Sequence, residues 1–520
     1  MKKTLTIFFA AAACFANSQT FSWSQKSTFK KGDQVVIDSV GNLFVTGHFG
    51  NTYPSWSSTI KKFDNNGNLL WETDLPFTET RIAVDKSGNS YLSGVDTNGY
   101  YILRFSEAGV FTNKTLVIPA INRAQQGQIT GIHVDNSNNV IVSGLFKGTL
   151  HLGNSELNGA STFNTLRLFV AKFNSEIKCL WAKCATNGHF YTACSFADKN
   201  GNTIVGGETI DTVAIAQLQV PGNPTSPDAF ICLFDSNGTC KWLKSVGTST
   251  GQEFVSALCG DGEGNFYAAG YFDSNMTIEN NSLSASGINA NIFLWKISLS
   301  GQTQWAKQFG GSVSEYAHSL SSIASRLYLT GTFSGNTKFD SFLLSSNAGN
   351  PNMEGFALCT DLLGNSKWAI TLGGVNGSDS KCFGSCADQQ GLYITGTFSG
   401  SINFGIHPQS ANESSLFVAK IIDEENLLLK ATTDTPIITI VKVFPNPTQK
   451  FIDVSFDAEH KQNITVELRS VDNKLLFFEE LEKLNGTYQR RISLEGASGG
   501  TYMLKIFIDG ALYTTKIIRN

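Results

Sequence analysis

The chain has 520 residues, more than the ~100 to 200 of an average domain, so we expect at least two domains or one large repeat architecture. Its 39 basic and 43 acidic residues give a net charge of -4, which argues against a nucleic-acid binder that neutralises phosphates. With 49 Gly and 38 Phe against 4 Met, and only 16% charged residues, the composition favours aromatic strands and tight turns. We therefore predict an all-β protein.

Residues 1–18 have the pattern of a secretory signal peptide. A basic start at Lys2 and Lys3 precedes a short apolar stretch and a group of small residues, with a cleavage site expected before Gln19. A buried first strand is the alternative. The apolar run is shorter than the ~20 residues that span a bilayer, and no later segment reaches that length. We expect export through the periplasm and no transmembrane segment.

A repeated turn and strand occupies residues 19–430. An Asp-x-x-Gly-Asn turn, in which Asp caps its own backbone and Gly accepts positive φ, leads into a strand that ends in glycine. A second aromatic strand and a third strand with tryptophan follow, so each unit contains about four short strands. This pattern predicts a seven-bladed β-propeller. The strand-ending glycines are Gly47, Gly94, Gly144, Gly207, Gly270, Gly331 and Gly396.

The tryptophan strand is irregular in two units. Phe111 and Leu429 stand at the expected tryptophan place in the second and seventh units, and the second unit is short enough to be a reduced blade. Two segments compete to close the ring: residues 427–431, or the tryptophan strand at 21–25. The other units carry Trp71, Trp181, Trp242, Trp305 and Trp368.

The repeat resembles the β-propeller repeats of secreted bacterial proteins. The shared pattern is V-D-x-x-G-N-x-Y-x-x-G, then F-V-A-K-F-D, then G-N-x-x-W, and it covers residues 21 to 430. The resemblance implies an architecture and leaves the activity open, because a fold does not define a function.

The last part of the chain has a different composition. Residues 431–442 are small and polar and then β-branched, which is typical of a linker. Residues 443–520 contain alternating strands separated by turns, which predict a small immunoglobulin-like β-sandwich.

Residues 443–520 resemble the C-terminal sorting domain of the type IX secretion system of Bacteroidetes. This resemblance implies the secretion machinery as a partner and a location at the outer-membrane surface or outside the cell. An ordinary immunoglobulin-like binding domain is the alternative. The candidate sorting residues are Phe444, Pro445, Asn446, Pro447, Gly500, Tyr502 and Lys516.

The sequence contains no catalytic constellation that we recognise. The 7 histidines are scattered, the acids recur at repeat turns, and neither a nucleophile elbow nor a phosphate loop is present. We predict no catalytic residue, no metal site and no cofactor, with calcium at residues 64–68 as an alternative. The cysteines left after signal-peptide removal are expected to be buried strand residues, with one or two disulfides formed during export as the alternative.

A basic residue occupies the same strand position in five units, and we expect it on a solvated strand face. A cationic ring lining a channel is the alternative. Polar insertions between strands, such as residues 273–290, are the expected recognition surface. We hypothesise a non-enzymatic binding or adhesion module for an unknown extracellular glycan or protein. The alternatives are a secreted polysaccharide hydrolase and a structural surface component. The basic positions are Lys62, Arg104, Lys172, Lys296 and Lys420.

Overall fold

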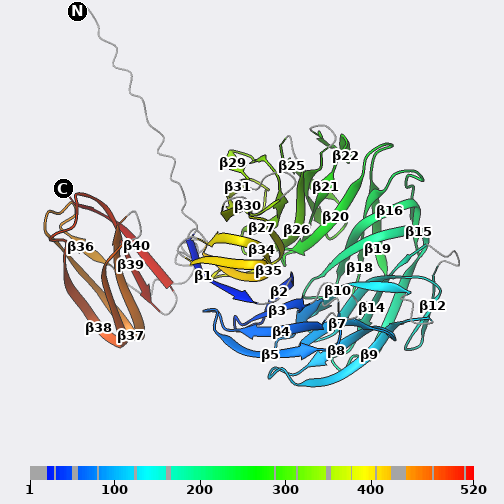
Figure 1. Ribbon diagram of the computed structural model, residues 1–520, viewed down its shortest axis with the longest axis horizontal. Helices are drawn as coiled ribbons and strands as arrows, with labels where there is room; N and C mark the ends of the chain where they lie inside the picture. Colours follow the sequence, from blue (N-terminus) through cyan, green and yellow to red (C-terminus); the bar gives the residue numbers. More distant parts are fainter. Residues whose placement is uncertain are drawn as a thin grey trace, which may run out of the picture. The chain divides into compact units, whose positions relative to one another are not determined.

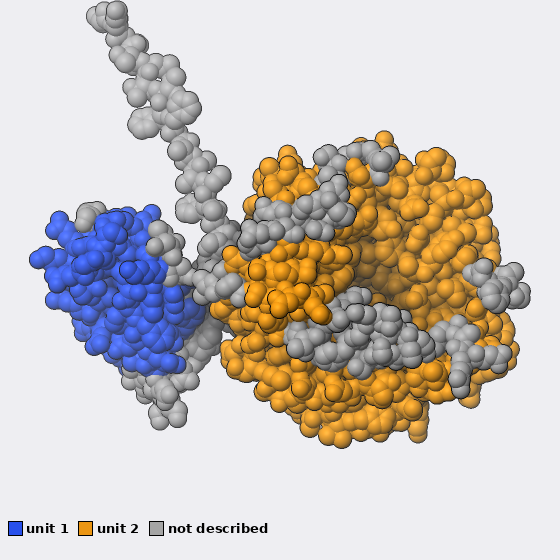
Figure 2. All heavy atoms as spheres, in the orientation of Figure 1, with its two compact units in different colours: residues 1–19, 423–520 blue, residues 20–422 orange. Residues whose placement is uncertain are grey.

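The computed structural model consists of β-strands throughout its described part, which confirms the all-β prediction. No helix there is long and apolar enough to cross a membrane. The chain divides into a propeller unit, residues 20–422, and a C-terminal unit formed by described residues after 422 (Figure 2). The predicted signal peptide lies outside the described residues. These are 20–27, 31–49, 57–78, 81–121, 126–159, 165–285, 289–311, 314–346, 353–375, 378–404, 407–422, 441–470, 474–508 and 511–519.

The propeller unit repeats one antiparallel sheet of four strands. In the first repeat, β2 (Lys31–Ile37), β3 (Leu43–Phe49), β4 (Ser57–Phe63) and β5 (Leu69–Leu75) pair in sequence order. Figure 1 shows the repeats following one another around the unit. The next repeats are β6 (Ile82–Val84), β7 (Ser90–Asp96), β8 (Gly99–Phe105) and β9 (Phe111–Pro119); then β10 (Gly127–Val134), β11 (Val140–Phe146), β14 (Arg167–Phe173) and the first part of β15 (Cys179–Ala197).

The later repeats keep this order. The second part of β15 begins the next sheet, with β16 (Thr203–Ile215), β18 (Asp228–Phe234) and β19 (Cys240–Val246). Two further sheets follow. They are β20 (Glu253–Gly260), β21 (Asn265–Phe272), β24 (Asn291–Ser298) and β25 (Thr303–Phe309), and then β26 (Glu315–Ile323), β27 (Arg326–Phe333), β30 (Glu354–Asp361) and β31 (Ser366–Leu372).

Short extra strands lie between the second and third strands of several repeats, opposite the Asp turns. We call this edge the insertion side. It also carries the connections from one repeat to the next, because all four strands are antiparallel. These extra strands are β12 (Thr149–Leu152) with β13 (Ser155–Asn158), β17 (Leu218–Val220) on β16, β22 (Met276–Ile278) with β23 (Asn281–Leu283), and β28 (Asn336–Phe339) with β29 (Phe342–Ser345). One further short strand, β32 (Gly374–Val375), lies in the connection to the last sheet and pairs with β34 (Gly391–Phe404).

The two ends of the propeller unit share one sheet. β33 (Ser380–Asp388), β34 (Gly391–Phe404) and β35 (His407–Ile422) are completed by β1 (Thr20–Ser27), which pairs antiparallel with β35 (Figure 1). The register places Trp23 opposite Lys420, just as Trp71 lies opposite Lys62 in the first repeat. The N-terminal tryptophan strand therefore takes the outer position, whereas residues 427–431 lie outside the described part of the chain.

The Asp turns owe their shape to local hydrogen bonds. One Asp38 carboxylate oxygen accepts bonds from the backbone N–H of Val40 at 3.0 Å and of Asn42 at 2.8 Å, and the other accepts the Asn42 side-chain amide at 2.8 Å. Asp85 and Asp261 make the same set. The predicted capping role of the repeated acids is confirmed, and these bonds occupy the carboxylates.

Neighbouring repeats are joined by a tryptophan that covers a turn glycine. The Trp71 indole N–H donates to the carbonyl of Glu107 at 3.0 Å. The ring lies over Gly109, where an added Cβ would come 2.8 Å from a ring carbon. Glycine is required there because φ is +75° and the ring leaves no space. Equivalent pairs are Trp23 with Gly67, Trp181 with Gly238, Trp242 with Gly301 and Trp305 with Gly364.

The second repeat replaces this tryptophan by asparagine. Asn113, and not Phe111, lies opposite Arg104, so the expected place of Phe111 was wrong. The same irregularity occurs in the first repeat, between Lys62 and Phe63, and Asn113 follows Arg104 at the interval at which Trp71 follows Lys62. Counting from the basic residue, and not matching by aromatic character, therefore gives the equivalent position. Asn113 donates to the carbonyl of Glu176 in the next repeat at 3.2 Å. The short second unit nevertheless forms a full four-strand sheet.

The repeated basic side chains are not on a solvated face. Lys62, Lys172, Lys296 and Lys420 are all less than one-tenth exposed. Lys172 Nζ lies 2.8 Å from a carboxylate oxygen of the turn residue Asp135, and Lys420 Nζ lies over the Tyr393 ring. Alternation of side chains along a strand produces a solvent-exposed face only when one side of the sheet is uncovered. Here both sides of each sheet pack against neighbouring sheets.

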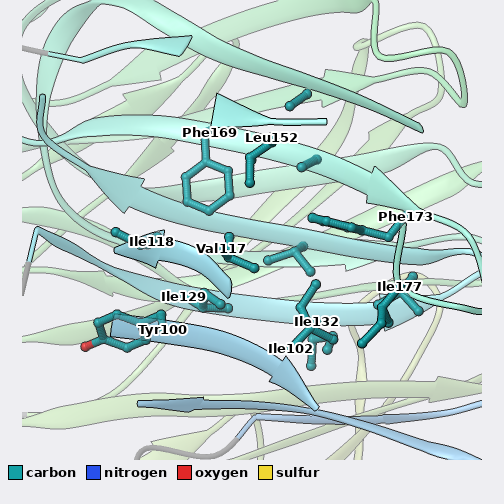
Figure 3. Close-up of a cluster of buried hydrophobic side chains, with 14 of the residues drawn as sticks. Tyr100, Ile102, Val117, Ile118, Ile129, Ile132, Leu152, Phe169, Phe173 and Ile177 are labelled. Atoms are coloured by element: carbon teal, nitrogen blue, oxygen red, sulfur yellow. The ribbon is translucent and has the colours of Figure 1, made fainter. Parts of the chain in front are cut away.

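Apolar side chains fill the spaces between successive sheets. In the cluster of Figure 3, Tyr100 and Ile102 of β8 pack with Ile129 and Ile132 of β10 and with Phe169 of β14. These residues come from two adjacent repeats. Each sheet therefore gains its core by stacking on the next one.

The C-terminal unit has its own core. β37 (Phe451–Ser470) pairs with β36 (Lys442–Phe444), with β38 (Leu475–Ser493) and with β39 (Gly500–Ile508), and β40 (Ala511–Arg519) completes the sheet on β39. Its buried residues, such as those of β37 and β39, form one cluster that contains no described residue of the propeller unit.

Candidate functional site

The candidate sorting segment is attached to the last strand of the C-terminal unit. The Asn446 side chain donates to the carbonyl of Lys516 at 2.6 Å and accepts from the backbone N–H of Ile518 at 2.9 Å. Thr448 N–H donates to the carbonyl of Ile518 at 2.8 Å. Phe444, Pro445, Asn446 and Pro447 are exposed. The structure thus brings this segment and Lys516 together from 70 residues apart.

The other two candidate sorting residues have different surroundings. Tyr502 is 3% exposed and belongs to the core, and its hydroxyl donates to the carbonyl of Ser498. Gly500 is exposed and lies opposite Arg519. Tyr502 therefore positions β39, on which the final strand β40 lies. The sequence did not identify Thr448 or Ser498, because polar residues of this kind are common in turns.

A second candidate site lies on the insertion side of the propeller unit. Phe254 of β20 and Tyr271 of β21 are paired, with ring centroids 5.5 Å apart. Tyr316 of β26, in the next repeat, lies edge-on to Tyr271 at 5.4 Å. All three side chains are half-buried. They leave apolar and phenolic surface accessible near the edge that carries the insertions.

Carboxylates surround these rings. Burial, together with the nearby Glu208, Tyr316 and Asp273, raises the pKa of the Tyr271 phenol to about 12. Burial also raises the pKa of Glu208, which lies on β16 in the preceding repeat. We call Glu208, Phe254, Tyr271, Asp273 and Tyr316 the insertion-side cluster. It draws its members from three successive repeats.

A polar depression adjoins this cluster. Its volume is about 470 Å³. Asp273 belongs to both features, and one of its carboxylate oxygens accepts the Gln252 backbone N–H at 2.8 Å. Part of the lining comes from the insertion that begins at Asp273, and part from the connection before β20. The lining residues are Thr248, Ser249, Thr250, Asp273, Ser274, Asn275 and Ala285.

A fully buried carboxyl supports one wall of the depression. Glu253 accepts bonds from the Thr248 backbone N–H at 3.3 Å and from the Thr248 hydroxyl at 3.0 Å. Glu315 begins the first strand of the next repeat and accepts the Gly311 N–H at 3.1 Å. The same arrangement in two repeats indicates that these acids fix the connection between sheets.

We predict from the pKa values of Glu253 and Glu315 that the free energy of unfolding decreases with rising pH. Burial raises the pKa of each carboxyl from 4.5 to about 7. Because the folded chain then holds the proton more tightly than the unfolded chain, this contribution is complete below about pH 4.5 and is lost as the pH rises through about 7. We expect urea unfolding at several pH values to show a loss of about 1 kcal/mol or more for each carboxyl.

The double variant Glu253→Gln, Glu315→Gln tests the assignment. It should flatten the pH dependence over this window, since glutamine does not titrate. Glu72→Gln, an exposed change on β5, should retain the original slope. An unchanged slope in the double variant would contradict the prediction.

Other titratable side chains lie apart from this site. His133 is enclosed between sheets beside Ser195, with 2.9 Å between Nε2 and the hydroxyl oxygen, and burial lowers its pKa to about 4. The described cysteines are free thiols, and burial raises the pKa of Cys194 and Cys382 to about 12. Within the described residues, no group of three or more His, Cys, Asp or Glu is placed to hold a metal.

The sheets of residues 20–422 have a β-propeller-like fold, because successive antiparallel sheets follow one another around the unit. Comparison with known proteins concerns the C-terminal unit. Residues 442–520 match the family model of the secretion system C-terminal sorting domain. The protein is therefore cargo of the type IX secretion system and is delivered to the cell surface or the extracellular space.

The solved structures that resemble the chain are distant. A fungal alcohol oxidase of the AA5 family in complex with copper is 11% identical, covering 96% of this chain and 99% of its own, with a TM-score of 0.43. The β-propeller domain of the trilobed protease from Pyrococcus furiosus is 8% identical, covering 75% and 97%, with a TM-score of 0.41. The chain covers 57% of the Pyrococcus horikoshii acylaminoacyl peptidase, which is 8% identical over 82% of this chain with a TM-score of 0.43. A search of curated proteins gave no match.

Proposed function

We propose that the exported chain carries a closed seven-bladed propeller that acts as a non-enzymatic binding or adhesion module. The pairing of β1 with β35 supports closure, because it joins the first and last segments of the propeller unit in one sheet. Trp23 then covers Gly67 of the first repeat, as the tryptophans of other repeats cover the next turn. We also propose that residues 443–520 form an immunoglobulin-like β-sandwich.

The insertion-side cluster is the observation that carries the binding function. Half-buried aromatic rings offer large contact area with little loss of conformational entropy, and they suit the faces of sugars or apolar side chains. Hydroxyl and amide groups of the adjoining depression supply hydrogen bonds. The partner is an extracellular glycan or protein, and a purely structural surface component would not need this site.

A secreted hydrolase is the second candidate, because Glu253 and Glu315 combine burial with a pKa raised to about 7. Such a carboxyl is suited to general acid catalysis. We favour a structural role because Glu253 uses both oxygens to hold Thr248. Substrate turnover that is abolished by Glu253→Gln while folding is retained would favour the hydrolase.

Tyr271→Ala tests the binding proposal in the mature full-length protein. Binding to an array of polysaccharides and outer-surface proteins should be saturable, without release of products. Because Tyr271 contacts both other rings, its removal should weaken the binding found there at least about tenfold. Phe111→Ala, which alters an exposed ring on the outer strand β9, is the control. Equal binding by Tyr271→Ala and the unaltered protein would contradict the proposal.

A further inference from the structure

The charges of the insertion-side cluster bear on which ligand it accepts. We propose that the cluster binds glycans built from neutral or amino-bearing sugars and discriminates against glycans that carry carboxylate or sulfate groups. This inference rests on the binding function proposed above and narrows it to one class of partner.

The first step concerns shape and hydrogen bonding. The Tyr271 ring meets Phe254 and Tyr316 edge-on, so the three rings form an angular surface rather than a flat stack. Such a surface can contact the C–H face of a sugar ring. The depression beside it is lined mainly by hydroxyl and amide side chains, among them Thr250 and Asn275, which can bond to sugar hydroxyls.

The second step concerns charge. Asp273 lies two residues beyond Tyr271 at the end of β21. Glu208 lies on β16, where an added Cβ at Gly206 would come 2.8 Å from Val255 of β20, so this part of β16 packs beside Phe254. Both acids act on the Tyr271 phenol and lie within electrostatic reach of a group bound against it. A ligand carboxylate or sulfate would meet like charge where water is partly excluded, and repulsion is stronger there than in bulk solvent. A sugar ammonium group would instead gain a charge-assisted hydrogen bond and attraction to the ring faces.

The third step concerns Lys381, the basic residue that takes the place of Tyr316 in the last repeat. Lys381 on β33 pairs with Thr397 on β34, as Tyr316 on β26 pairs with Thr332 on β27. Its ammonium group lies 3.7 Å from a carboxylate oxygen of Asp379. This pairing offsets the positive charge of Lys381, as the pairing of Lys244 with Glu279 does on β19.

The experiment compares three forms of one oligosaccharide. A neutral oligosaccharide that binds the mature protein is prepared unchanged, oxidised at C6 to the carboxylate, and substituted with an amine. We expect calorimetry at low salt to show that the amino and neutral forms bind with at least about tenfold higher affinity than the carboxylate form. Raising the salt should narrow this difference.

Glu208→Gln and Asp273→Asn locate the effect. Asparagine keeps the carbonyl that accepts the Gln252 N–H, so the loop should retain its shape. In the double variant, the affinities for the three oligosaccharide forms should lie within about threefold of one another. Glu72→Gln should leave the difference in affinity between the forms unchanged. The variants' thermal unfolding and circular dichroism verify that the fold is retained.

Several results would overturn the inference. Equal or tighter binding of the carboxylate form would do so, as would a difference that persists in the double variant. If the protein binds acidic glycans alone, or a protein partner and no glycan, the inference is also wrong. Saturable binding that Tyr271→Ala removes would then still support the binding module itself.

Discussion

Replacing Trp23 by alanine is expected to destabilise the propeller unit by about 3 to 5 kcal/mol, the range for loss of a large buried aromatic side chain. Trp23 is only 9% exposed. It packs with Tyr393 of its own sheet at a centroid distance of 6.4 Å and covers Gly67 of the first repeat. Its indole N–H donates to the carbonyl of Asn65 at 3.0 Å. The variant loses one of the buried contacts that join the last sheet to the first.

Urea unfolding of the mature protein, followed by circular dichroism and limited proteolysis, measures this effect. Trp23→Phe keeps most of the apolar contact and loses the hydrogen bond, so it should cost about 1 kcal/mol. Ser22→Ala alters an exposed neighbour in the same strand and serves as the control. A Trp23→Ala protein as stable as this control would show that β1 does not secure the sheet.

Deleting residues 442–520 is expected to abolish delivery to the cell surface and to leave the protein in the periplasm. These residues contain the whole match to the sorting family. The propeller unit should still fold, because the core cluster of the C-terminal unit contains none of its described residues. Cell fractionation of the native host, with the untruncated protein as reference, gives the distribution between periplasm, outer membrane and medium.

Asn446→Ala refines the same experiment. It removes both side-chain bonds between the sorting segment and β40, which should destabilise the C-terminal unit by about 1 to 3 kcal/mol and lower the delivered fraction. Glu495→Gln, an exposed change in the same unit, should leave delivery unchanged. Undiminished surface levels after the deletion would refute the role of residues 442–520 in export.

The sequence by itself determined the local features of the propeller. Each Asp turn depends on hydrogen bonds between residues two to four positions apart, such as Asp38 with Val40 and Asn42. The alternation of the following strands and the order of residues in the sorting segment are also local. For this reason the all-β class, the repeat and the sorting family could be predicted before any contact was known.

The tertiary structure decided how distant segments meet. The position of Trp23 depends on pairing with a strand almost 400 residues later, and the burial of Lys172 depends on sheets packing on both faces. The insertion-side cluster was not predicted, since Glu208, Tyr271 and Tyr316 come from three repeats and no one repeat contains the pattern. Spacing along the chain reports interactions within a turn or strand, whereas these contacts arise only when whole sheets stack around the unit.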